Sequence, residues 1–160
     1  MNLIIILLTA MFFPAQVIAS DTDSDMLSVS PRWANVRSGP GLEYEVLWEA
    51  VRYYPVEVVD SDGNWLMISD YENDEGWISR SLLSGRPAVV VVSEKANVRE
   101  GPGTGYDAVW VVDKEYSFKV LEAQGNWLKV SDGVKVSGWI HTSVIWGFID
   151  QPVVGKRPVY

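Results

Sequence analysis

The feature that most constrains the fold of this chain is an internal repeat. The segment ANVRSGPG at residues 34–41 returns as ANVREGPG at residues 96–103, GNWL at 63–66 returns at 125–128, and GWI at 76–78 returns at 138–140. All three pairs are 62 positions apart, and no gap is needed between residues 34 and 83. Such constant spacing indicates one structural unit present twice. The unit is longer than a solenoid repeat and its copies differ at many positions, so we expect two small domains.

Each unit is expected to be all-β. Residues 56–58 and 118–120 alternate apolar and polar side chains, as half-buried strands do. A Gly-Asn pair follows in both units and favours a tight hairpin turn before the next alternating run. Pro40 stands between two glycines, so residues 38–44 form a loop rather than a central strand. About five short strands in about 60 residues, with no helical period, predict a small barrel.

The three repeated motifs resemble those of the bacterial SH3 (SH3b, SH3-like) domain family. The resemblance covers residues 26–146 in tandem, and the triplet LWE at 47–49 and the segment SLLSGR at 81–86 resemble an exported, two-domain proteobacterial branch. It implies a five-stranded SH3-like barrel and a cell-envelope or cell-wall setting. Many family members are attached to peptidoglycan hydrolases and bind wall peptides or glycans.

The expected organisation places two barrels after an export signal. The apolar run at residues 3–13, followed by VIA at 17–19, is typical of a secretory signal peptide cleaved after Ala19. The expected domain boundaries are signal peptide 1–19, acidic leader 20–25, barrel one 26–84, linker 85–87, barrel two 88–147, and tail 148–160. The linker is too short for independent tumbling, so we expect the barrels to dock. The extended run at 88–92 should be the first strand of barrel two.

Composition excludes several classes of function. The chain has 160 residues, 21 acidic and 13 basic side chains, a net charge of −8 and a pI near 4.6. An acidic chain repels phosphates, which disfavours nucleic-acid binding. It contains no Cys and one His, which excludes a thiolate nucleophile and any site that needs two imidazoles. We therefore expect no cofactor, no catalytic residues, no metal site and, after signal cleavage, no membrane anchor.

The polar motifs have ordinary structural interpretations. His141 has no nucleophile or metal partner in the sequence and is interpreted as a surface residue. The acidic run at 70–75 favours a solvated hairpin loop over a weak divalent-cation site, because it lacks the glycine hinge and ligand spacing of a calcium loop. The glycine-rich segments at 37–41 and 99–103 lack the Lys and Ser/Thr of a phosphate loop. We expect their glycines to permit unusual backbone angles.

Aromatic residues repeated in both units are the candidate ligand-binding residues. Trp48/Trp110 and Tyr54/Tyr116 are assigned to core packing. Trp65 and Trp127 differ, because strand alternation puts Trp127 on the face of Lys129, opposite Leu128 and Val130. A half-exposed aromatic ring there suits a peptide or sugar platform. The complete candidate set is Trp65, Trp127, Tyr44, Tyr106, Trp77 and Trp139, with the two tyrosines as the other wall of a groove and the last two tryptophans as its extension.

We recognise no catalytic domain in the sequence, so the expectation is a non-enzymatic binding protein, periplasmic or secreted. Its expected ligand is the stem peptide of peptidoglycan or an extended segment of an envelope protein, with bare wall glycan a weaker variant. The alternative is a structural or assembly protein of the envelope that docks a protein partner and binds no small ligand. Sedimentation with isolated peptidoglycan sacculi distinguishes the two.

Overall fold

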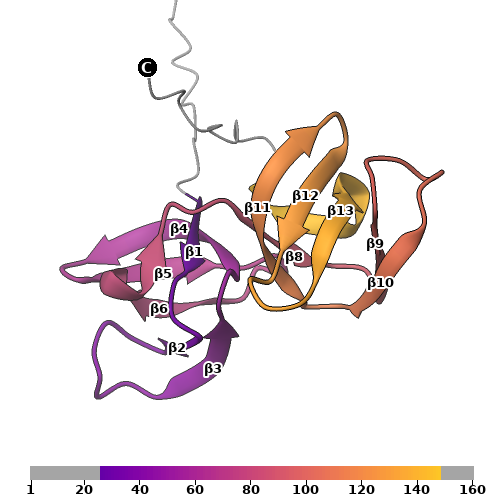
Figure 1. Cartoon of the computed structure of the whole chain (residues 1–160). Helices are drawn as coiled ribbons and strands as arrows, with labels where there is room; N and C mark the ends of the chain where they lie inside the picture. Colours follow the sequence, from indigo (N-terminus) through magenta and orange to yellow (C-terminus); the bar gives the residue numbers. More distant parts are fainter. Residues whose placement is uncertain (1–25, 149–160) are drawn as a thin grey trace, which may run out of the picture.

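The computed structural model describes residues 26–148 of the chain. The segments expected to be a signal peptide and an acidic leader, and all but the first residue of the expected tail, lie outside the described residues. The described part is all-β and forms two barrels, one following the other along the chain (Figure 1). Within residues 26–148, no helix combines the length and the apolar character needed to cross a membrane.

The first barrel is one antiparallel sheet in the strand order β3-β2-β6-β5-β4-β1-β7. Its elements are β1 (Met26–Val29), β2 (Trp33–Arg37), β3 (Val46–Val51), β4 (Pro55–Asp62), β5 (Trp65–Ser69), β6 (Glu75–Ser79), the 3-10 turn η1 (Arg80–Leu82) and β7 (Leu83–Ser84). The sequence predicts five strands. The sheet has seven, with β1 paired to β4 on one side and to the two-residue edge strand β7 on the other.

The second barrel repeats this topology in the order β10-β9-β13-β12-β11-β8-β14. Its elements are β8 (Ala88–Val91), β9 (Lys95–Arg99), β10 (Ala108–Asp113), β11 (Ser117–Gln124), β12 (Trp127–Ser131), β13 (Ser137–His141), the 3-10 turn η2 (Thr142–Val144) and β14 (Ile145–Gly147). The apolar run after the linker is β8, as predicted. Both Gly-Asn hairpins are present, and Gly63 and Gly125 adopt φ of +56° and +55°, which glycine adopts without steric cost.

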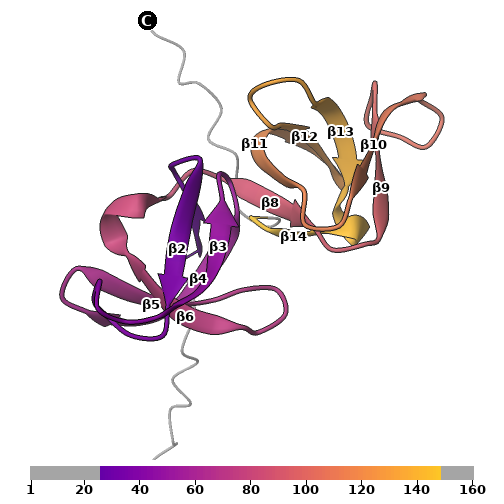
Figure 2. The ribbon, with the colours of Figure 1, turned by 90° about the horizontal axis from the view of Figure 1, so that it is seen from below.

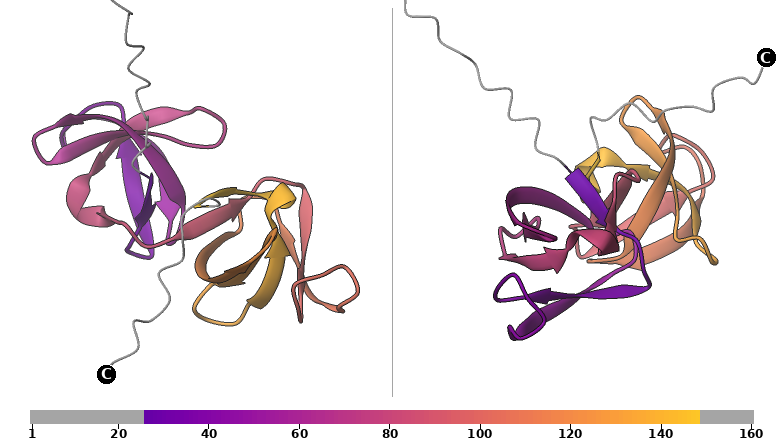
Figure 3. Two further views of the ribbon diagram at one scale, coloured as in Figure 1. Left: turned by 90° about the horizontal axis from the view of Figure 1, so that it is seen from above. Right: turned by 90° about the vertical axis from the view of Figure 1, so that its left-hand side faces the viewer.

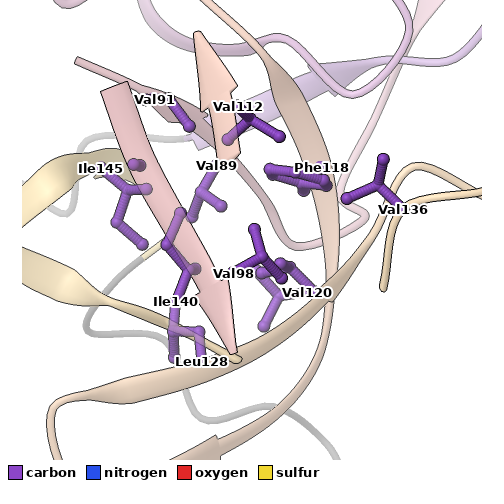
Figure 4. Close-up of a cluster of buried hydrophobic side chains, with 12 residues drawn as sticks. Val89, Val91, Val98, Val112, Phe118, Val120, Leu128, Val136, Ile140 and Ile145 are labelled. Atoms are coloured by element: carbon purple, nitrogen blue, oxygen red, sulfur yellow. The ribbon is translucent and has the colours of Figure 1, made fainter. Parts of the chain in front are cut away.

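Each barrel encloses its own apolar core. In β5, Leu66 and Ile68 are fully buried, and Leu128 and Val130 take the same places in β12. The second core gathers valines of β8, Phe118 of β11 and Ile140 of β13 inside the sheet (Figure 4). Trp48, Trp110, Tyr54 and Tyr116 pack against these cores, as predicted. The strands thus turn alternate side chains inward and leave the intervening ones on the outer face.

The two barrels contact each other directly. Tyr53, Ala88 and Phe148 form a small buried cluster between them, and the Ser28 hydroxyl donates to the Arg86 carbonyl at 2.8 Å, which ties the linker to β1. Figures 2 and 3 show the barrels side by side, with β8 leading from the first into the second. The short linker therefore joins barrels that are in contact, in agreement with the expected docking.

Candidate binding grooves

Two of the surface grooves lie at equivalent places on the two barrels. Groove 1 has a volume of about 780 Å³ and is lined by Trp33, Ala34, Asn35, Arg37, Pro40, Gly41, Leu42, Glu43, Glu49, Trp65, Ser79 and Leu82. Groove 2 has a volume of about 310 Å³ and is lined by Lys95, Ala96, Asn97, Arg99, Thr104, Trp127, His141, Ser143 and Val144. Most lining positions correspond through the repeat, so the fold forms the same groove twice.

Trp65 and Trp127 occupy equivalent places in the two grooves. Each is the first residue of its strand, β5 or β12, and each is half-buried, while the residue that follows it is buried in the core. Neither belongs to a buried core cluster. The predicted orientation of these two rings, on the face opposite the core, is confirmed.

An arginine holds the loop that walls each groove. Nη1 of Arg37 donates to the carbonyl oxygens of Leu42 at 3.2 Å and Tyr44 at 2.8 Å. Nη1 of Arg99 makes the equivalent bonds to Thr104 at 3.5 Å and Tyr106 at 2.7 Å. The first loop therefore has a fixed shape in both barrels. Sequence reasoning missed this role, although both arginines are part of the repeated ANVR motif.

The glycines of these loops make room for a tyrosine ring. A Cβ added to Gly39 would lie 2.4 Å from the Tyr44 ring, and one added to Gly101 would lie 2.5 Å from the Tyr106 ring. None of the loop glycines has positive φ, so the expectation that they permit unusual backbone angles is wrong. Close ring packing is the physical reason for Gly39 and Gly101.

The loop tyrosines do not line the grooves. Tyr44 and Tyr106 are 42% and 51% exposed and pack on their glycines, while the loop wall is formed by neighbours such as Pro40 and Thr104. The loop thus provides the other wall that the sequence predicts, but with different side chains facing the groove.

Trp77 and Trp139 also lie outside the grooves. Trp77 pairs across the strands with Met67, and Trp139 pairs with Lys129. Trp139 is only 7% exposed, and the Lys129 ammonium lies 6.0 Å from its ring centroid. The structure therefore does not bring these two rings together with Trp65 and Trp127 in one groove.

A tyrosine–aspartate pair supports the hairpin beside each barrel core. The Tyr54 hydroxyl donates to Asp70 at 3.0 Å, and the Tyr116 hydroxyl donates to Asp132 at 2.8 Å. Burial, together with the hydrogen bond and the charge of Asp132, raises the pKa of Tyr116 to about 12. Burial, with the charge and the hydrogen bond of Asp70, also raises the pKa of Tyr54 well above its ordinary value. Both hydroxyls stay protonated donors at neutral pH.

The two aspartates organise their loops through the backbone. Burial tends to raise the pKa of Asp132, but hydrogen bonds from the Val134, Lys135 and Val136 amides and the Tyr116 hydroxyl outweigh it and hold that pKa below its ordinary value. Asp70 likewise accepts from backbone amides of the acidic loop. Among residues 26–148 no three acidic or imidazole side chains are grouped to hold a metal ion.

His141 lies in groove 2, a position that sequence reasoning missed. The Ser143 amide donates to its Nδ1 at 3.2 Å, and its ring meets Trp127 edge to face with centroids 5.0 Å apart. Trp33 was missed in groove 1, where its ring is 55% exposed. Neither residue is repeated: the position equivalent to His141 holds Ser79, and the position equivalent to Trp33 holds Lys95. Repetition between the units therefore gives no signal for either residue.

Comparison with known proteins identifies the domains. Residues 30–85 match one model of the bacterial SH3 domain and residues 94–145 match another. The two matches together span more than half of the chain, which therefore belongs to the bacterial SH3 domain family and carries two such domains in tandem.

The curated relatives are named as cell-wall enzymes. The chain is 25% identical over 122 residues to the "Putative N-acetylmuramoyl-L-alanine amidase YrvJ" of Bacillus subtilis, a match that covers 69% of this chain and 23% of the relative. It is 32% identical over 60 residues to the "Probable cell wall amidase LytH" of Staphylococcus epidermidis, covering 34% of this chain and 20% of the relative. The chain thus spans less than a quarter of these relatives.

The solved structures with similar folds are more distant. NlpC1 of Trichomonas vaginalis has 13% identity and a TM-score of 0.36, over 79% of this chain and 47% of that one. NlpC2 of the same organism has 12% identity and a TM-score of 0.35, over 77% and 48%. Likeness at this level has no bearing on function.

The relatives correct one expectation. The expectation of a non-enzymatic envelope protein, whether ligand-binding or structural, is wrong, because the curated relatives are named as amidases and indicate a cell-wall hydrolase context. The absence of Cys and of a nucleophile motif is a property of the SH3 barrels themselves. It does not determine the activity of a protein that carries such barrels, because a fold does not determine function.

Proposed function

We propose that the two SH3 domains are the wall-binding part of a cell-wall hydrolase system and bind peptidoglycan peptides in grooves 1 and 2. They act outside the cytoplasm, at the cell wall. The names of the curated relatives support this context. The single observation that carries the proposal is a half-buried tryptophan at the same place in both grooves.

The grooves suit an extended peptide. Each has an aromatic ring on the strand side and a loop of fixed backbone on the other. The ring offers apolar area at low entropic cost, since a tryptophan side chain has only two rotatable bonds. Asn35 and Asn97, at equivalent lining positions, supply amide groups that donate to and accept from a peptide backbone. We propose the peptidoglycan stem peptide as the ligand.

Sedimentation with purified sacculi tests the proposal. The chain is expected to sediment with the sacculi, the Trp65→Ala and Trp127→Ala variants to sediment less, and the double variant to remain in the supernatant. Leu121→Ala is the control, because Leu121 is an exposed apolar residue that lines neither groove. If the wild-type chain stays in the supernatant, or the double variant sediments like the control, the proposal is wrong.

The hydrolase context is tested with the same variants. An amidase added to sacculi together with the chain should release peptide faster than the amidase alone if the chain contributes to such a system. The double tryptophan variant should remove this gain. An equal gain with the wild type and the double variant would contradict a role for the grooves.

A further inference from the structure

The repeat provides an internal comparison of the two grooves. Their backbones and their tryptophans are equivalent, so a side chain that differs between them is not required by the fold. The differences concern charge and aromatic area. Groove 1 carries Trp33, Glu43 and Glu49, and the equivalent positions hold Lys95, Gly105 and Val111. Groove 2 carries His141 where groove 1 carries Ser79.

Groove 1 has the composition of a site for a cation. Two carboxylates and two indole rings line it. Its one guanidinium, on Arg37, holds the loop through two carbonyl oxygens. The Arg32 guanidinium, which is not among the lining residues, lies 4.5 Å from the centroid of the Trp33 ring. Trp33 therefore already faces a cation of the chain, and Trp65 is the ring assigned to the ligand. Carboxylates beside an aromatic face attract an ammonium group by charge and by the ring quadrupole.

Groove 2 has the opposite composition. Its lining residues include Lys95, Arg99 and His141 and no carboxylate. Asp113 pairs with Lys95 from outside the groove, but both side chains are mostly exposed and such pairs contribute little. Because the Ser143 amide donates to Nδ1 of His141, the neutral ring carries its proton on Nε2. Groove 2 therefore offers N–H donors beside the Trp127 ring.

We infer that the two grooves prefer peptide groups of opposite charge. Groove 1 binds an ammonium-bearing side chain beside Trp65, and groove 2 binds a carboxylate beside Trp127. This inference rests on the proposed function, since it assigns the ligand chemistry of the same grooves. A peptide that carries both an amine and a free carboxylate engages both barrels. Two weak sites on one chain then act together, which raises the overall affinity without any new contact.

Two short peptides test the inference separately from wall binding. The indole N–H signals of Trp65 and Trp127 are assigned in an NMR spectrum with Trp65→Phe and Trp127→Phe variants. The chain is then titrated with acetyl-Gly-Lys-Gly-amide and with acetyl-Gly-Glu-Gly-amide. The lysine peptide should shift the Trp65 signal at a concentration at least fivefold below that needed for Trp127, and the glutamate peptide should show the reverse order.

Exchange of residues between the repeats is the matched control. Trp33→Lys, Glu43→Gly and Glu49→Val install in groove 1 the residues that the fold accepts in the second unit. These variants should lose the preference of groove 1 for the lysine peptide. Lys95→Trp with His141→Ser should abolish the preference of groove 2 for the glutamate peptide.

The outcomes are distinguishable. If both peptides shift the same indole N–H signal at the same concentration, or if neither peptide shifts either signal, the inferred charge preference of the grooves is wrong. Sedimentation of the same sample with sacculi then shows whether the proposed function survives. If the peptides discriminate but the chain does not sediment, the ligand chemistry stands and the wall-binding function falls.

Discussion

At the scale of single residues, the repeat separates what the fold requires from what a ligand requires. Trp65 and Trp127 begin equivalent strands and keep their rings outside the cores, whereas Trp48 and Trp110 pack against the cores. A ring that is repeated but half-exposed contributes less to folding than a ring repeated inside a core. Substitution at the two kinds of position should therefore differ in its effect on stability.

Trp127→Ala is expected to reduce sedimentation of the chain with sacculi and to lower the free energy of unfolding by only about 1 kcal/mol, because the ring fills no core cavity. Trp110→Ala, the matched control, should cost about 3 kcal/mol through lost core packing. Urea denaturation measures both. Equal losses for the two variants would show that Trp127 is a structural residue.

Asp132→Asn tests the aspartate of the second hairpin. The folded-state pKa of Asp132 lies below the ordinary value of 3.8, so its contribution is complete above about pH 4 and disappears as the pH falls through the folded-state pKa. The variant should be about 1 kcal/mol less stable at pH 7, and its stability should fall less between pH 4 and pH 2 than that of the wild type. Thermal unfolding at several pH values measures this difference.

Asp107→Asn is the control for that experiment, because Asp107 is exposed and no side-chain hydrogen bond holds it. It should leave the pH profile unchanged. Parallel profiles for wild type and Asp132→Asn would mean that the hydrogen bonds to the Asp132 carboxylate contribute no stability.

At the scale of elements, the strands were predictable and the loop side chains were not. Apolar alternation and the Gly-Asn turns are local signals, and they predict β4, β5 and the hairpin between them. The position of Tyr44 depends instead on the loop folding back over Gly39, and the role of Arg37 depends on carbonyl groups five and seven residues away. Composition alone carries no signal for such contacts.

The first loop of the second barrel provides the third prediction. Gly101→Ala should displace the Tyr106 ring, because the new methyl group would lie 2.5 Å from it. The ring is half-exposed and can swing outward, so we expect a loss of about 1 kcal/mol, at the low end of the cost of overpacking. The Tyr106 ring signals in an NMR spectrum should move.

Gly105→Ala is the matched control in the same loop, since no atom lies within 4 Å of the added methyl group and its φ is not positive. It should change stability by less than about 0.5 kcal/mol. If both alanine variants leave the Tyr106 signals in place, close packing is not why position 101 holds a glycine.

At the scale of the whole molecule, one residue with an unusual backbone conformation lies at the contact between the barrels. Tyr53 adopts φ of +68° and Glu115, its repeat equivalent, adopts +70°, so the turn itself requires a left-handed residue. The choice of tyrosine at position 53 has another cause: its ring is buried with Ala88 of β8 and with Phe148, which directly follows β14. Nearby, Lys114 and Glu72 pair across the interface at 2.8 Å.

Tyr53→Ala should therefore loosen the pair without unfolding either barrel. The turn keeps a residue at the same φ, and Tyr53 belongs to neither barrel core, but the interface loses its central ring. In wild type, backbone ¹⁵N relaxation should give the same rotational correlation time for both barrels, and in the variant the two times should shorten and diverge. Tyr71→Phe, which keeps the ring and removes an exposed hydroxyl that bonds to Glu115 at 3.3 Å, should leave them unchanged. Separate correlation times already in the wild type would show that the barrels touch without forming one rigid body, and each groove would then bind its part of a ligand independently.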